Sequence, residues 1–280
     1  MGFMFRKWSF SNMYFKAQTF YSIWAMALFV LALTGCFSGK KSESESMVSP
    51  PDMHTSQISL DWIGDYIGVI PCADCQGIYY HLSISEDGLY HIKRMYLGES
   101  YKILVDQGQF SWTASGNAIR LDEGQVFIVH ENALLYADQD GNRIGGEFAN
   151  HYRLPKVDVG PLSGDPPRSL TESKWVVEIL LKQGEEKWET NLPSLEFESQ
   201  GKLSGRAQCN SYFSNYSVPA TQRIEVGTIS STKMACPKLD DERDYMDALN
   251  DMRYFFIWND KLMLISDEFS PLFLARSILK

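Results

Sequence analysis

Basic residues are scarce in this chain of 280 residues. Its 26 lysines and arginines are outnumbered by 35 aspartates and glutamates, and the net charge is −9. The first 35 residues contain three basic residues and no acidic one, so the remainder is more acidic still. Because phosphate binding needs clustered Lys and Arg, this charge excludes nucleic acid as a partner. Any attachment to an anionic membrane must likewise be covalent or hydrophobic.

The familiar catalytic motifs are also missing. None of the five histidines lies in H-E-x-x-H, and no G-x-S-x-G elbow or phosphate-cradling glycine loop occurs. His81 and His91 fall on neighbouring predicted strands, and we interpret both as residues of the sheet surface. The sequence therefore predicts no catalytic residue and favours a protein that binds or senses over an enzyme.

Cysteine is sparse as well, with five residues in the whole chain. Cys36 stands apart from the other four, which are Cys72, Cys75, Cys209 and Cys236. An even number of cysteines is expected in a protein of an oxidising compartment, where they can pair.

An apolar segment near the N-terminus predicts export. The uncharged run Tyr21–Leu33 is too short for the roughly 20 residues of a spanning helix and is typical of a secretory signal. The following residues, Leu33-Thr-Gly-Cys36, resemble the lipobox of bacterial lipoproteins. That resemblance implies a signal peptide at residues 1–35 and a lipid-anchored Cys36. Because Phe37 rather than Asp follows the cysteine, the sorting rule implies the outer membrane, with the chain facing the periplasm.

Composition divides the mature chain into two domains. Residues 36–59 are rich in Ser, Glu, Lys and Pro and predict a flexible tether. Residues 60–154 consist of short alternating runs broken by Gly, Asn and Asp, which predict a first domain. Residues 155–168 contain four prolines and predict a linker before a second domain at residues 169–280.

The alternating runs of the first domain predict an antiparallel β-structure. Ile78–Ile84 and Leu89–Tyr96 flank an Asp-Gly turn and read as a hairpin. Further strands are predicted at 108–112, 118–121, 125–130, 133–137 and 147–154. About seven strands at this spacing indicate a small barrel or sandwich.

The second domain combines predicted strands with one helix. Strands are expected at 174–181, 194–198, 202–209, 224–229, 255–258 and 261–265. A helix should follow Pro237, because acidic residues 240–242 suit a helix N-terminus. The same segment has an apolar stripe at helical spacing, namely Leu239, Tyr245, Met246, Leu249 and Met252.

Residues 62–82 (WIGDYIGVIPCADCQGIYYHL) resemble the N-terminal domain of the NlpE lipoproteins. The resemblance continues through Tyr96–Gly98, Gly108–Trp112 and Asp140–Ile144. That family is named for copper resistance and is associated with envelope-stress signalling. The resemblance implies a small lipocalin-like antiparallel β-barrel.

The second domain is similar to the META/HslJ family. The matching residues are Trp175, Gly201–Gly205, Cys209–Tyr212, Tyr216, Ile229–Cys236 and the helix at 242–249, although Gln208 replaces the usual glycine before Cys-Asn. The family is tied to heat-shock and stress phenotypes and has no established catalytic site. The resemblance implies a mainly β chain that ends in a β-rich α+β domain with one main helix.

Three interpretations of Cys72 and Cys75 stay open. They form a structural disulfide, or a redox-responsive pair, or a Cu(I) site, since soft thiolates suit that ion and Met95, His81 or His91 could assist. A thioredoxin-like oxidoreductase is disfavoured, because its motif precedes a helix and here a strand follows.

Cys209 and Cys236 predict a second disulfide that closes a loop of 28 residues. In the chain-entropy model this loop contributes about 3.6 kcal/mol. The alternatives are buried free thiols, or a soft-metal ligand within Met234–Cys236.

The leading functional hypothesis is a non-enzymatic outer-membrane lipoprotein of stress adaptation. It would report faults in lipoprotein sorting, surface contact or thiol oxidation by engaging an inner-membrane sensor. A Cu(I) buffer or transfer protein is the first alternative, with Cu(I) as the one cofactor considered. The second is a lipocalin-like carrier of a small apolar ligand, because an eight-stranded barrel can hold one.

Overall fold

The protein is described by a computed structural model that covers residues 54–160, 166–181, 191–235 and 239–279. The predicted signal peptide, Cys36 and most of the predicted tether lie outside these residues. Within the described ranges, no helix is both long enough and apolar enough to span a membrane.

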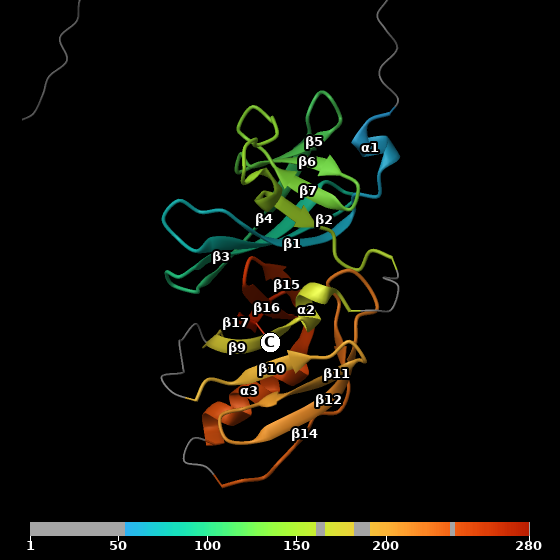
Figure 1. The fold of residues 1–280 in the computed structure, drawn as a ribbon. Coiled ribbons are helices and arrows are strands. Elements are labelled where there is room, and N and C mark those ends of the chain that lie inside the picture. The colour runs from blue at the N-terminus through green and yellow to red at the C-terminus, as the bar shows by residue number, and fades with distance from the viewer. Residues whose placement is uncertain (1–53, 161–165, 182–190, 236–238, 280) are drawn as a thin grey trace, which may run out of the picture. The chain divides into compact units, whose positions relative to one another are not determined.

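The first sheet is a nearly closed antiparallel barrel in which each strand pairs with the next along the chain (Figure 1). Its strands are β1 Gly64–Ile70, β2 Gly77–Ile84, β3 Leu89–Leu97, β4 Ile103–Trp112, β5 Ala118–Leu121, β6 Val126–His130, β7 Ala133–Tyr136 and β8 Arg153–Pro155. The chain after β8 lies against β1. Tyr66 forms a β-bridge with Lys156, and the Val157 amide donates to the Asp65 carbonyl at 2.9 Å. The predicted mainly β fold with a small barrel is confirmed.

Alternation along the strands fills the barrel interior. Inward positions of successive strands form one cluster, made of Tyr66, Ile70, Tyr80, Leu82, Ile84, Tyr90, Ile92, Phe110, Ile119, Leu121, Phe127, Val129, Leu134 and Leu154. Trp62 and Trp112 pack against this cluster. Their two rings meet edge to face, with centroids 5.3 Å apart. These two tryptophans are therefore part of the core packing.

The second sheet is curled and runs in the order β13-β12-β11-β10-β9-β17-β16-β15, with β14 pairing β12. Its strands are β9 Ser173–Leu180, β10 Ser194–Phe197, β11 Lys202–Arg206, β12 Ser211–Ser217, β13 Glu225–Val226, β14 Ser230–Ser231, β15 Met252–Trp258, β16 Lys261–Ser266 and β17 Pro271–Leu279. The helices and the 3-10 turn of the described chain are α1 Ser56–Ser59, α2 Arg168–Thr171, α3 Leu239–Asp251 and η1 Ala149–His151.

Helix α3 supplies the apolar stripe that the sequence predicts. Tyr245 and Leu249 are fully buried in the core of the second sheet, and Met246 packs against that core. Trp175 of β9 is 1% exposed in the same cluster, and its indole N–H donates to the Leu170 carbonyl at 3.0 Å. The helix N-terminus carries Asp240, Asp241 and Glu242 in its first turn, where the helix dipole favours negative charge.

Some residues at the edges of the predicted tether (36–59) and the predicted linker (155–168) form hydrogen bonds with the folded sheets. In α1, the Ser56 amide donates to Asn117 Oδ1 at 2.8 Å and its hydroxyl to the Val129 carbonyl at 2.9 Å. After β8, Lys156 and Val157 are buried, and the Asp158 amide donates to the Thr221 carbonyl at 3.2 Å. Polar and Pro-rich composition predicted loops, but long-range hydrogen bonds order these flanking residues.

Several strands also differ from their predicted ranges. The predicted strand at 147–154 is η1 followed by the short β8, and the predicted strand at 202–209 ends at Arg206. The predicted strand at 224–229 is reduced to β13, whereas β12, β14 and β17 were not predicted.

Candidate functional site

The loop between β1 and β2 is closed by a disulfide between Cys72 and Cys75, whose Cα atoms are 5.3 Å apart. Gly77 begins β2 at φ +145°, and a Cβ there would lie 2.6 Å from Val69 Cγ1. Only glycine therefore lets the chain re-enter the sheet this close to β1. Of the three interpretations of Cys72 and Cys75, the structure agrees with the disulfide. The possible redox response of this bond stays a prediction.

A cavity of about 240 Å³ lies beside the disulfide. Cys72, Pro71 and Gln76 of the loop line it, together with the aromatic side chains of Phe148, His151 and Trp258. Phe148 is 60% exposed, so this wall is an apolar surface open to solvent. The cavity could hold a small apolar group against the disulfide.

Two of the three other residues named for copper are buried in the structure. His81 is buried and bonded to Asp65, Met95 is fully buried in a hydrophobic cluster, and His91 is exposed. Among the described residues, no group of three or more His, Cys, Asp or Glu side chains is arranged to hold a metal ion. Cu(I) binding by the reduced Cys72 and Cys75 stays a prediction.

His81 corrects the sequence interpretation, because it is a buried residue and not part of the sheet surface. It is 6% exposed, and its Nε2 lies 2.8 Å from Asp65 Oδ1 on β1. Burial lowers the pKa of His81 below its ordinary value, and the charge of Lys93 adds to this effect while Asp65 opposes it. The neutral ring therefore donates Nε2–H to the carboxylate, and its buried Nδ1 has no hydrogen-bond partner in the described chain.

The pKa of the Asp65 carboxyl is also lowered from its ordinary value. Burial alone would raise the pKa of Asp65, but the hydrogen bond and charge of His81 outweigh it and lower the pKa. Sequence reasoning missed Asp65, because nothing local in β1 distinguishes it from a solvent-facing strand residue.

The His81 ring stacks on Phe269, which lies in the turn between β16 and β17 of the second sheet. The ring centroids are 4.0 Å apart with an interplanar angle of 10°. The Tyr79 hydroxyl donates to the Phe269 carbonyl at 3.1 Å, and Lys93 Nζ donates to the Glu268 carbonyl. Residues of both sheets share a hydrophobic cluster around this contact, including Ile67, Met95, Met263 and Leu274. The turn is thus fastened to the barrel by stacking, hydrogen bonds and apolar packing.

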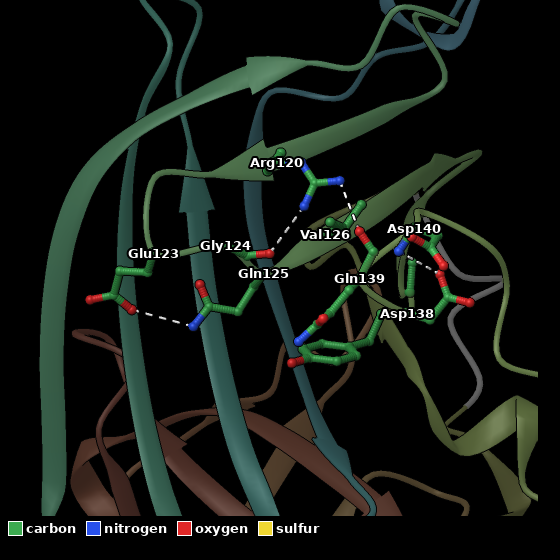
Figure 2. A pocket seen from close by; sticks show the side chains of 10 residues that line it. Arg120, Glu123, Gly124, Gln125, Val126, Asp138, Gln139 and Asp140 are labelled. Atoms are coloured by element: carbon green, nitrogen blue, oxygen red, sulfur yellow. Dashed lines mark hydrogen bonds between the residues drawn. The ribbon is translucent and has the colours of Figure 1, made fainter. Parts of the chain in front are cut away.

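A larger, polar pocket of about 520 Å³ lies at the β5–β6 turn (Figure 2). Arg120 donates to the carbonyls of Gly124 at 3.4 Å and Gln139 at 3.0 Å, which ties this turn to the turn after β7. Gln125 Nε2 donates to Glu123 at 3.3 Å, and Asp138 accepts the Asp140 amide at 3.0 Å. Most of these hydrogen bonds shape the two turns, although the buried Gln125 Oε1 has no hydrogen-bond partner among the residues that the structure describes. The residues that line the pocket include no paired nucleophile and base.

The Cys209-Asn210 motif of the second sheet is held by Glu242 of α3. The carboxylate accepts the Cys209 amide at 2.9 Å, the Asn210 amide at 3.0 Å and Asn210 Nδ2 at 2.6 Å. Cys209 is disulfide-bonded, whereas its predicted partner Cys236 lies outside the described residues, so the pairing itself stays a prediction.

Comparison with known families and proteins agrees with this arrangement. Residues 66–147 match the NlpE N-terminal domain family, and residues 168–277 match the META domain family. Lipoprotein NlpE of Escherichia coli (strain K12) is 28% identical over 129 residues, which are 44% of this chain and 52% of that protein. The chain therefore spans about half the length of this relative.

Two solved structures are also similar. A candidate lipoprotein from Shewanella oneidensis shares 45% identity, with 37% of this chain and 95% of that chain covered and a TM-score of 0.36. The Cpx pathway activator NlpE from Escherichia coli shares 18% identity, with 61% and 90% covered and a TM-score of 0.28. Residues 66–147 of the chain are thus similar to an NlpE N-terminal domain, and residues 168–277 are similar to a META domain.

Proposed function

We propose that this chain is an outer-membrane-anchored lipoprotein that faces the periplasm and reports envelope stress, without catalysing a reaction. One observation carries the proposal. In the sequence, the residues that match the NlpE N-terminal domain follow an apolar segment and the lipobox-like motif Leu33-Thr-Gly-Cys36. The relative in Escherichia coli is named a lipoprotein and a Cpx pathway activator, which supports a role in stress sensing.

The physical logic of the proposed report is location. Acyl chains on Cys36 would make the anchor effectively permanent, because each buried CH₂ contributes about 0.8 kcal/mol. A chain sorted to the outer membrane is then far from an inner-membrane sensor. A chain whose sorting stalls stays beside that sensor and can engage it.

Retention in the inner membrane tests this proposal. Phe37→Asp places an acidic residue directly after Cys36 and should hold the protein in the inner membrane. We expect a several-fold rise in an envelope-stress reporter in the host, measured together with membrane fractionation. Phe37→Ser is the matched control, because it also removes the aromatic ring but adds no charge.

Two results would contradict the proposal. The first is a Phe37→Asp protein that accumulates in the inner membrane and leaves the reporter at the level of Phe37→Ser. The second is an intact mass showing an uncleaved leader or an unmodified Cys36 thiol, which would remove the anchor itself.

A further inference from the structure

Strand β4 has one unpaired edge over its first five residues. Its ladder with β3 runs from Met95 opposite Ile103 to Leu89 opposite Gln109, whereas its ladder with β5 begins only at Phe110. Among the described residues, no strand pairs with the other side of Ile103–Gln107. The residues Ile103–Gln107 are called the open edge below.

Hydrogen bonds at the end of the ladder show which backbone groups face outwards. The Phe110 amide donates to Gly88, on the β3 side, and the Gln109 carbonyl accepts the Asp122 amide, on the β5 side. Because these groups alternate along a strand, the amides and carbonyls of Ile103, Val105 and Gln107 point away from β3. They offer three donors and three acceptors to a further strand.

The pairing of β4 with β5 stops for a local reason. The Asp122 carboxylate accepts the Tyr90 hydroxyl at 2.6 Å and the Gln109 amide at 3.2 Å. It lies so close to Gly108 that a Cβ there would be 2.4 Å from Asp122 Oδ2. The Asp122 carboxylate thus occupies the position next to Gly108 and Gln109 where the β4–β5 ladder ends. After Asp122 the chain turns into β6, so in the part of the chain that the structure describes the open edge has no partner on this side.

The open edge is apolar and accessible. Val105 is 63% exposed and Leu104 is 38% exposed. The one charged residue, Asp106, is paired with Arg94 of β3. Proteins usually protect exposed strand edges with charged side chains, proline or a bulge. Within Ile103–Gln107 the one charge is already paired with Arg94, and there is no proline or bulge.

We propose that the open edge pairs with the open edge of a second copy of this chain, antiparallel about a two-fold axis at Val105. This register sets Val105 against Val105 of the second copy, Leu104 against Asp106, and Ile103 against Gln107. No like charges then face each other, and the three outward amides of each copy meet three outward carbonyls. A two-fold contact between identical patches is closed, so it yields a dimer rather than a filament.

The contact is small, and a stable interface usually buries more than about 1,000 Å². The dimer is therefore weak in dilute solution and forms where copies are concentrated. The proposed lipid anchor would supply that condition, because it confines the chains to one membrane plane and raises their effective concentration. The self-pairing rests on the β4 geometry, and a failure of anchoring is detected separately by membrane fractionation.

Cysteine cross-linking of the full chain in native membranes tests the register. Antiparallel partners lie about 5.5 Å apart at Cα, within the range that a disulfide needs. We expect Val105→Cys to form a disulfide-linked dimer several-fold more than Gln107→Cys. The Gln107→Cys control is exposed on the same strand, but its counterpart in the dimer lies about 14 Å away at Cα.

A mixed experiment confirms the register independently. Chains with Ile103→Cys and Gln107→Cys should cross-link when expressed together and much less when expressed alone. Equal cross-linking of Val105→Cys and Gln107→Cys would overturn the proposal. So would an absence of dimer in membrane fractions that contain the anchored protein, or a Val105→Cys adduct with a different protein only.

Discussion

At the scale of single residues, the Cys72–Cys75 disulfide fixes a loop more than it stabilises the barrel. In the chain-entropy model a closed loop this short contributes only about 2 kcal/mol. We expect Cys72→Ser with Cys75→Ser to lower the free energy of urea unfolding by that amount and to leave the barrel folded. Ala73→Ser, an exposed change in the same loop, is the control. A loss of the cooperative transition would show that the barrel depends on the bond.

Glu242 is the residue that ties α3 to the start of β12. Burial alone would raise its pKa, but the hydrogen bonds from Asn210 and Cys209 lower it below the ordinary value. Its contribution is therefore present above an ordinary glutamate pKa and lost as pH falls through the lowered one. We expect Glu242→Gln to cost about 1.5–3 kcal/mol at neutral pH, as hydrogen bonds to charged groups do.

Chemical denaturation at pH 7 and at pH 3 measures this difference. Asp251→Asn is the control, because Asp251 is exposed on the same helix. The destabilisation caused by Glu242→Gln should shrink at the lower pH, because the contribution of the carboxylate decreases as pH falls from the ordinary glutamate pKa toward the lowered one. A constant difference at both pH values would mean that the charge of Glu242 contributes nothing.

At the scale of elements, the close approach of β10, β11 and β12 depends on Gly205. A Cβ at this position would lie 2.0 Å from the Ser194 carbonyl oxygen and 2.4 Å from Tyr212 Oη. The Tyr212 hydroxyl in turn donates to the Ser194 carbonyl at 3.0 Å and contacts Tyr245 Oη at 2.8 Å. Gly205→Ala should therefore disrupt this sheet and lower its stability by about 3 kcal/mol or more.

The effect of Gly205→Ala is read from thermal unfolding of the full chain. Gly227→Ala is the matched control, since the nearest atom to its added Cβ would be 3.5 Å away. Similar melting temperatures for the two variants would show that the strands separate easily at Gly205.

Elements with a strong local pattern could be predicted from the sequence. The hairpin of β2 and β3 has an Asp-Gly turn, and α3 has an acidic first turn and an apolar stripe. Strand β12 (SYFSNYS) was missed because its serines and asparagine resemble a loop. In the sheet the buried Ser214 hydroxyl lies within hydrogen-bond distance of the carbonyls of Gly227 and Thr228. Partners outside the strand therefore satisfy the hydrogen-bonding need of this buried polar residue.

The same distinction applies to the candidate site. The disulfide could be predicted because Cys72 and Cys75 are neighbours along the chain. The Asp65–His81 pair depends on strand register, and the stacking of His81 on Phe269 joins residues far apart in the sequence. Periodicity and composition report local structure, and so they cannot identify contacts of this kind.

At the scale of the whole molecule, the contact between the barrel and the β16–β17 turn should weaken in acid. The groups that face His81 are Asp65 on β1 and Lys93 and His91 on β3, with Phe269 stacked on its ring. Because burial lowers the pKa of His81, its neutral form is favoured in the folded state. This contribution is present above the ordinary histidine pKa of about 6.5 and is lost as pH falls through the lowered value.

Hydrogen exchange of the turn at residues 266–270 at pH 7.5 and pH 5 measures this contact. Protection of the Phe269 amide, which donates to the Ser266 carbonyl at 3.1 Å, should fall at pH 5 after correction for intrinsic exchange rates. His81→Gln keeps an N–H donor for Asp65 but does not titrate in this range, so its protection should change less between the two pH values. Asp65→Asn should increase the pH dependence, because the carboxylate that stabilises a protonated His81 is gone. If wild type and His81→Gln lost protection equally, the titrating group would lie elsewhere in the contact.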